Sequence, residues 1–181
     1  ITNVNLYEFG LSDKDETLAF YAPSGSNQGI GSFNQTTIAK GNRETPKLQL
    51  YEGDNFLRKR SAGKISLIKI DVEGFEKKVI SGLRETLEEN RPIIVCEISY
   101  NEQLSFQSKE SLLSYLPPNY ALYRFNTRKA DGSKAKRRGS SAKRSGLYET
   151  VEFSEWRMSG QDDVIAVPRE KIDIFQRCKS A

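Results

Sequence analysis

The stretch Ile65-Ser66-Leu67-Ile68-Lys69-Ile70-Asp71-Val72-Glu73-Gly74-Phe75-Glu76 decides the fold of this chain. An apolar run ends in two carboxylates and a glycine, and an amphipathic helix is expected to follow directly and to end at Pro92. The residues of its apolar face recur every four positions: Phe75, Val79, Leu83 and Leu87. A second apolar run, Ile93–Cys96, then leads to Glu97. Near-continuous apolar strands on either side of a helix are typical of a parallel βαβ unit covered on both faces.

Three carboxylates fall where these two strands are expected to end. Asp71 and Glu73 follow the first strand, and Glu97 follows the second. In open parallel sheets, ligands bind beyond the carboxyl ends of the strands. Neighbouring carboxylates also raise one another's pKa, which suits a base that works near neutral pH. We therefore take Asp71, Glu73 and Glu97 as candidate catalytic residues. The alternative for Glu73, and for Glu76 after it, is a stabilising acid at a helix N-terminus.

The composition excludes several kinds of site. The chain contains no histidine, so a Ser-His-Asp triad, a Cys-His pair and a histidine-ligated metal site cannot form within it. General base work would fall to a carboxylate, a lysine or a tyrosine, and no metal site is predicted. Cys96 lies in an expected buried strand and is predicted to be a core residue.

The length and hydropathy indicate one domain in an aqueous compartment. The 181 residues suffice for a substantial core, and we expect a single domain over residues 1–181. No apolar run is long enough to cross a membrane and no secretory signal is visible, which favours a cytoplasmic location. A reducing compartment also fits the two distant cysteines.

Basic residues are concentrated in one segment, Arg124–Arg144. It holds nine of them against one acid, Asp131, so it carries a net charge of +8 while the rest of the +4 chain carries −4. We predict a flexible, basic insertion at residues 126–146. It would be either a solvated insertion without a partner or a surface for anionic membranes or phosphorylated glycans. The lack of interleaved aromatic residues disfavours a nucleic-acid site.

Alternation of apolar and polar residues predicts further elements outside the central βαβ unit. The expected strands are Val4–Phe9, Thr17–Tyr21, Lys47–Tyr51, Tyr120–Phe125 and Asp163–Pro168, and a short helix is expected at Ser111–Leu116. Glycine, serine and asparagine predict a loop over residues 24–34.

Several short motifs are distributed from Asn3 to Pro168. They are Gly10-Leu11-Ser12-Asp13, Ile68–Glu76, Val79-Ile80-Ser81-Gly82, Arg91-Pro92 and Val164–Pro168. A further one is Gly53–Leu57, in which Gly53 stands where a leucine is usual. Together they resemble the FkbM-type family of class I S-adenosylmethionine-dependent methyltransferases. The resemblance covers most of the chain except the basic insertion, and Ile68–Glu76 is its most specific part.

The resemblance implies a seven-stranded sheet in the order 3-2-1-4-5-7-6, with strand 7 antiparallel. Strands 3 to 7 would be Asn3–Phe9, Ile65–Ile70, Ile93–Ile98, Tyr120–Phe125 and Asp163–Val167. Strands 1 and 2, which would carry the glycine-rich loop and the acidic residue that holds the cofactor ribose, have no counterpart. We therefore expect an incomplete, Rossmann-like α/β sheet, and we expect this chain to be the C-terminal part of a longer protein.

The resemblance also implies a reaction. S-adenosylmethionine would be the cofactor, and the acceptor would be a hydroxyl of a sugar, a glycan or a small natural product. Asp71 and Glu73 would hold or deprotonate that hydroxyl, with Glu97 as a third candidate. Ser12 and Asp13 match the family region that borders the cofactor adenine, and their alternative role is an Asx turn after a strand.

Two further alternatives stay open. Trp156 would either line an acceptor pocket or simply pack against neighbouring residues. The chain as a whole would either catalyse methyl transfer or be a catalytically inactive binding module that uses its basic segment on an anionic partner.

Overall fold

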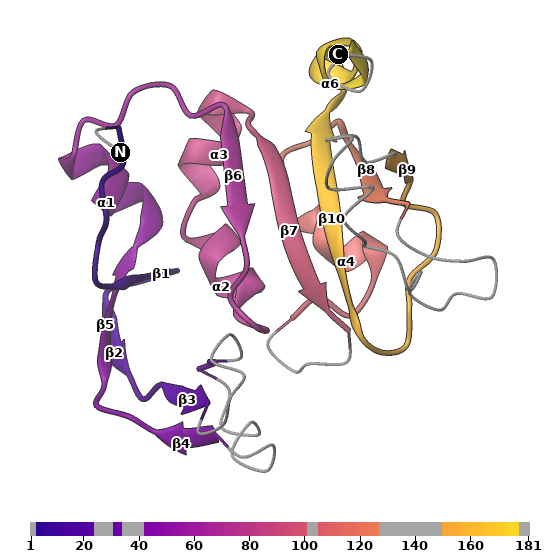
Figure 1. Cartoon of the computed structure of the whole chain (residues 1–181). Helices are drawn as coiled ribbons and strands as arrows, with labels where there is room; N and C mark the ends of the chain where they lie inside the picture. The colour runs from indigo at the N-terminus through magenta and orange to yellow at the C-terminus, as the bar shows by residue number, and fades with distance from the viewer. Residues whose placement is uncertain (1–2, 24–30, 34–41, 101–104, 127–149, 178–181) are drawn as a thin grey trace.

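The computed structural model describes residues 3–23, 31–33, 42–100, 105–126 and 150–177 (Figure 1). Apart from Asn126, the predicted basic insertion at residues 126–146 lies outside the described residues. The strands are β1 Gly10–Ser12, β2 Glu16–Leu18, β3 Tyr21–Pro23, β4 Asn42–Glu44, β5 Leu48–Glu52, β6 Leu67–Ile70, β7 Ile93–Ser99, β8 Tyr120–Phe125, β9 Thr150–Glu152 and β10 Gln161–Pro168. The helices are α1 Gly53–Lys59, α2 Glu76–Ser81, α3 Arg84–Asn90, α4 Lys109–Ser114 and α6 Ile172–Arg177, with a 3-10 turn at Arg169–Lys171.

The largest sheet has five strands in the order β6-β7-β10-β8-β9. β6 and β7 are parallel, and β10 runs antiparallel to both β7 and β8. This confirms the predicted βαβ unit, the relative order of the last four predicted strands and the antiparallel last strand. β9, which pairs with β8, was not predicted, because its three residues carry too short a pattern to be recognised.

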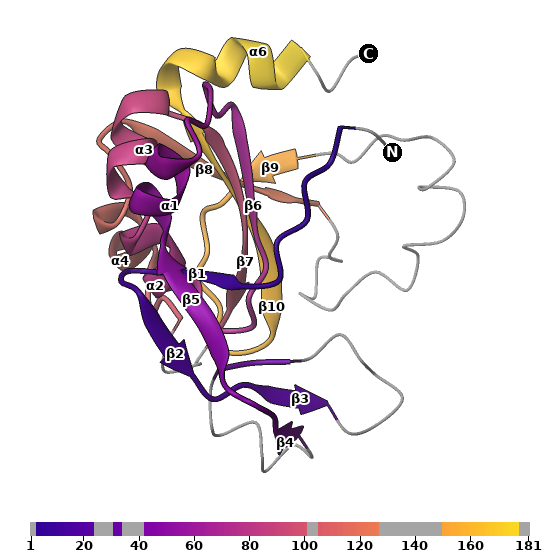
Figure 2. The same cartoon turned by 90° about the vertical axis from the view of Figure 1, so that its left-hand side faces the viewer.

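Four of the helices, α1 to α4, lie on one side of this sheet. Figure 2 shows α1, α2, α3 and α4 together on the same face. They bury the inward-facing residues of the strands, which include Ile70, Ile94, Cys96, Ile98, Val164 and Ala166, against Phe75, Val79, Ile80, Leu83, Leu87 and Leu112. Cys96 is therefore a core residue, as predicted. Among the described residues, no helix is long and apolar enough to cross a lipid bilayer.

The predicted single helix between β6 and β7 is wrong, because the chain forms two helices there. α2 ends at Ser81 and α3 begins at Arg84. At the break, the backbone and the side chain of Asp54, which lies earlier in the chain, bond to backbone groups that a continuous helix would pair within itself. The backbone N–H of Asp54 donates to the carbonyl of Gly82 at 2.6 Å, and the Asp54 carboxylate accepts from the first turn of α3. The apolar period continues across the break, so periodicity alone could not show it.

The buried Asp54 side chain stabilises the start of α3. Its two oxygens accept the backbone N–H groups of Glu85 at 2.8 Å and of Thr86 at 2.9 Å, which satisfies two donors that a helix N-terminus leaves unpaired. We expect Asp54→Ala to lower the free energy of unfolding by about 2 kcal/mol, since it leaves two backbone donors of α3 without their partner, one of them buried. Urea unfolding measures this. Asp15→Ala is the matched control, because Asp15 makes a similar but exposed bond to the N–H of Glu52. Equal losses for both variants would contradict the capping role.

The N-terminal region departs from the sequence prediction. Asn3–Phe9 is not a strand, since β1 begins only at Gly10 and pairs in parallel with β5. Leu6 in this stretch is 86% exposed. A β-pattern becomes a strand only where a neighbouring strand supplies hydrogen-bond partners, and none of the described residues pairs with this stretch. The predicted strand at Thr17–Tyr21 is likewise split between β2, which pairs with β5, and β3, which pairs with β4.

Candidate active site

Three of the predicted catalytic residues come together at one edge of the five-stranded sheet. Ile70 at the end of β6 lies beside Cys96 of β7, so the next residues along each strand, Asp71 and Glu97, meet at the carboxyl edge. Glu73 follows in the turn before α2. Carboxylate oxygens of Asp71, Glu73 and Glu97 all lie within 4.8 Å of one another. We call these three residues the acid cluster.

The turn that carries Glu73 is tight and well anchored. Glu73 has a φ of 49° and Gly74 a φ of 96°, and this left-handed backbone is uncommon for a residue with a side chain. The Ser32 hydroxyl donates to the carbonyl of Glu73 at 2.8 Å, and the Gly74 N–H donates to Glu76 Oε1 at 2.8 Å. Glu76 is fully buried and turns back onto this loop. This fits the alternative role predicted for Glu76, an acid that stabilises the entry into α2.

Lys69 supplies a positive charge beside the acid cluster. Its Nζ lies 2.9 Å from Asp71 Oδ2 and 3.6 Å from Asp163 Oδ1. Burial lowers the pKa of Lys69, but the hydrogen bond and charge of Asp71, together with Asp163 and Glu97, outweigh burial and raise it. Lys69 therefore stays protonated beside Asp71.

Glu97 is the carboxyl group that titrates near neutral pH. Burial, followed by the charges of Asp71, Glu73 and Asp163, raises the pKa of Glu97 to about 7, and Glu97 also shares a hydrogen bond with Asp71. The neighbouring carboxylates contribute to the raised pKa of Glu97, although burial contributes more. Near neutral pH, Glu97 therefore loses and regains its proton easily.

This raised pKa makes folding stability depend on pH. Unfolding returns Glu97 to its ordinary pKa of 4.5, whereas the folded chain keeps the proton up to about 7. Between these values the folded state binds more protons, so the free energy of unfolding falls as pH rises. Glu97→Gln removes this loss, and we expect the variant to gain stability relative to the native chain between pH 4.5 and pH 8. Urea unfolding at both pH values measures the difference. A difference that does not change with pH would contradict the raised pKa.

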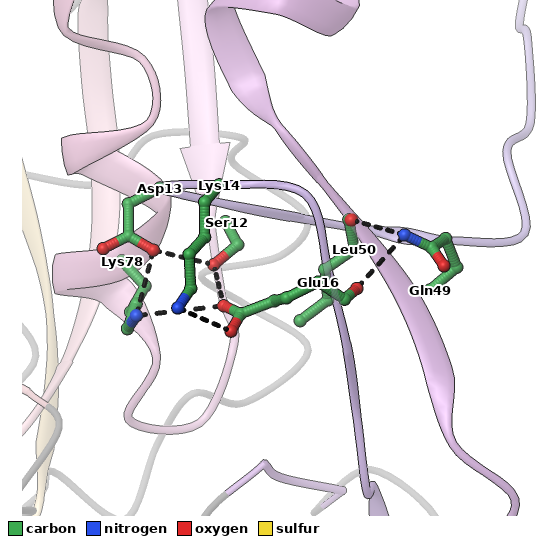
Figure 3. A network of polar contacts seen from close by, with 7 residues as sticks. All are labelled: Ser12, Asp13, Lys14, Glu16, Gln49, Leu50 and Lys78. Atoms are coloured by element: carbon green, nitrogen blue, oxygen red, sulfur yellow. Dashed lines mark hydrogen bonds and ion pairs between the residues drawn. The ribbon is translucent and has the colours of Figure 1, made fainter.

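The predicted cofactor residues, Ser12 and Asp13, lie in a separate polar network at the end of β1 (Figure 3). Ser12 is fully buried, and its hydroxyl donates to Glu16 Oε1 at 2.7 Å. Lys78 of α2 donates to Asp13 Oδ1 at 2.9 Å and lies 3.8 Å from Glu16. These contacts tie the three-stranded sheet, in the order β1-β5-β2, to α2. A role of Ser12 and Asp13 beside the cofactor stays a prediction.

Sequence reasoning missed three residues of the site: Lys69, Gln161 and Asp163. Lys69 and Asp71 are two positions apart, so the sequence could have shown that their side chains point to the same side of an extended chain. Asp163 lies opposite Glu97 only because β10 pairs with β7 in this register, which the sequence does not show. Gln161 donates to Glu73 Oε2 at 2.8 Å.

Trp156 packs within an aromatic group. Its ring lies 5.2 Å from Tyr100 and 5.8 Å from Phe153, both edge-on. These contacts fit the second of the two roles considered for Trp156, packing against neighbouring residues.

The acid cluster and its described neighbours carry more acidic than basic side chains. Four carboxyl groups, those of Asp71, Glu73, Glu97 and Asp163, lie near Lys69, so an excess of negative charge favours a cation nearby. Close carboxylates are also common ligands for divalent cations, but Lys69 already supplies a positive charge here and we assign the cluster no metal. Two cavities of about 400 and 260 Å³ lie elsewhere, among the helices, and none of the four carboxylates lines them.

Comparison with known proteins identifies the family. The family model for the methyltransferase FkbM domain matches residues 2–125 of the 181. Searches of curated proteins and of solved structures found no match. The matched region contains all three residues of the acid cluster, together with Ser12 and Asp13. The chain therefore belongs to the FkbM methyltransferase family.

Proposed function

We propose that this chain contributes the acceptor side of an S-adenosylmethionine-dependent O-methyltransferase that acts on a hydroxyl of a sugar, a glycan or a small natural product. The acid cluster is the observation that carries the proposal. It places Glu97, whose pKa is raised to about 7, beside Asp71 and Glu73, at the sheet edge where ligands of such folds bind. The family match supports methyl transfer in general.

Asp71 and Glu97 have different tasks in this proposal. Asp71 is oriented by its contact with Lys69 at 2.9 Å, so its carboxylate is placed to accept the hydrogen bond of the acceptor hydroxyl. Glu97 takes the proton of that hydroxyl, because a base is most effective when its pKa lies near the working pH. S-adenosylmethionine, when bound, supplies the electrophilic methyl group. The protein residues hold the acceptor oxygen in position and remove its proton.

The sheet itself suggests where cofactor-binding strands belong. Among the described residues, β6 is an edge of the five-stranded sheet and β1 an edge of the three-stranded sheet. Leu67 of β6 is 62% exposed, although edge strands usually shield apolar side chains. The resemblance places two strands between the expected strands Asn3–Phe9, which directly precedes β1, and Ile65–Ile70, which contains β6. We propose that such strands complete a Rossmann-like sheet and carry the cofactor loop.

Transfer of a labelled methyl group tests the proposed function. The chain is expressed with any coding sequence that precedes Ile1 and incubated with methyl-labelled S-adenosylmethionine and a panel of sugars, glycans and hydroxylated natural products. We expect at least one O-methylated product, identified by mass spectrometry. Failure to bind the cofactor, shown by calorimetry, would overturn the proposal and favour the binding module. In that case neutralising the basic residues of Arg124–Arg144 should abolish binding to anionic vesicles or glycans.

A further inference from the structure

Gln161 connects the last strand of the sheet to the acid cluster. It is the first residue of β10 and lies opposite Ser99, the last residue of β7. Its Nε2 donates to Glu73 Oε2 at 2.8 Å and approaches the Ser99 hydroxyl at 3.3 Å. Gln161 also lies beyond residues 2–125, the part of the chain that the family model covers. A residue from outside the matched region therefore contacts the most specific motif within it.

Glu73 is held by two hydrogen bonds, one to its backbone and one to its side chain. Its backbone carbonyl accepts the hydroxyl of Ser32, a residue that is only 1% exposed. Its side chain accepts the amide of Gln161. The left-handed backbone of Glu73, with a φ of 49°, costs free energy for a residue that is not glycine. The anchors at both ends of Glu73 keep its carboxylate directed at Asp71 and Glu97.

An amide is the side-chain group that suits this position. A lysine at position 161 would form an ion pair with Glu73, as Lys69 does with Asp71, and would weaken its negative charge. A carboxylate there would repel the whole cluster. The glutamine amide donates a hydrogen bond to a carboxylate without adding any net charge. Glu73 therefore keeps its charge, and that charge is one of the causes that raise the pKa of Glu97.

We propose that Gln161 is a positioning residue of the candidate active site, which holds the Glu73 carboxylate against Asp71 and Glu97. For the methyltransferase, this inference rests on the proposed function: Glu73 then orients the acceptor hydroxyl while Glu97 takes its proton. The hydrogen bond and its effect on the acid cluster do not depend on the reaction. They are measured in the chain alone.

The titration of Glu97 tests the inference without cofactor or acceptor. Gln161→Leu removes the donor, and the freed Glu73 carboxylate moves away from Glu97. Because the Coulomb energy falls with distance, we expect the apparent pKa of Glu97 to fall from about 7 by roughly 0.5 to 1 pH unit. Carbon-13 NMR of glutamate-labelled protein follows this titration, with Glu97→Gln as the assignment control.

A matched variant separates positioning from general strand stability. Gln49→Leu removes an amide that also lies in a strand but donates to the backbone carbonyls of Glu16 and Leu50, and it should leave the titration of Glu97 unchanged. If Gln161→Leu does not fold, Ser99→Ala removes the second partner of the amide and should shift the same pKa less, in the same direction. An unchanged titration in the folded Gln161 or Ser99 variant overturns the positioning role and leaves the proposed methyl transfer standing. A native chain that titrates as described but transfers no methyl group overturns only the proposed function.

Discussion

Gly82→Ala is expected to destabilise the chain by about 3 kcal/mol or more, the largest stability effect that we predict for a single methyl group. A Cβ at this position would lie 1.9 Å from the carbonyl oxygen and 2.7 Å from the carbonyl carbon of Ser12. Both are backbone atoms, so no side chain can rotate away. The φ of Gly82 is −76°, which alanine adopts readily, and the cost therefore comes from the contact alone.

The contact at Gly82 joins two parts of the fold. β1 and α2 pack together there, and the Gly82 carbonyl also accepts the N–H of Asp54. Forcing the backbones apart would loosen β1 and the start of α3 together. Gly63→Ala is the matched control, because a Cβ there meets no atom within 4 Å, and it should be neutral or slightly stabilising. Urea unfolding of both variants checks the prediction, and similar midpoints would contradict the packing of β1 on α2.

Asp71→Asn is expected to slow methyl transfer by about 100-fold or more, within the range usual for loss of an acid–base group. Asparagine has the shape of aspartate, so the backbone turn is retained. Its amide carries no charge, however, and it loses the attraction of Lys69, which lies 2.9 Å from Asp71. The acceptor hydroxyl then loses its ionised hydrogen-bond partner. The pKa of Glu97 should fall as well, because the charge of Asp71 helps to raise it.

Two measurements distinguish catalysis from folding in this variant. The rate of methyl transfer from labelled cofactor gives the activity, and urea unfolding gives the stability. Glu88→Gln is the control, since Glu88 is exposed on α3 and pairs with Arg84 four residues earlier. It should transfer methyl groups at the native rate. If Asp71→Asn transferred methyl groups at the native rate, Asp71 would have no role in the mechanism, although the family assignment would still stand.

The sequence was sufficient to predict the acid cluster. Two apolar runs, each followed by an acid, imply paired parallel strands, so Asp71 and Glu97 were expected to be neighbours. The expected end of the second strand before Glu97 is wrong, because β7 pairs with β10 as far as Ser99. Glu73 was predicted to lie with them because it follows the same strand as Asp71, two residues later. The prediction succeeded because these contacts depend on local pattern and on the pairing of consecutive elements.

Other features could not be predicted because they depend on contacts distant in sequence. The break between α2 and α3 depends on Asp54 and on the close approach of Ser12 to Gly82. The stretch Asn3–Phe9 has the pattern of a strand, yet it lacks a pairing partner among the described residues. Gln161 reaches Glu73 only through the antiparallel register of β10 and β7, and no local pattern encodes that register.

The pH dependence of the methyl-transfer rate tests the central claim most directly, namely that the acid cluster deprotonates the acceptor. The rate of the native chain, expressed with any coding sequence that precedes Ile1, should rise with a midpoint near the Glu97 pKa of about 7. In Glu97→Gln the rate should be lower and this rise should disappear. A rise that persists unchanged in Glu97→Gln, or a native rate that is flat between about pH 5 and pH 9, would contradict the account.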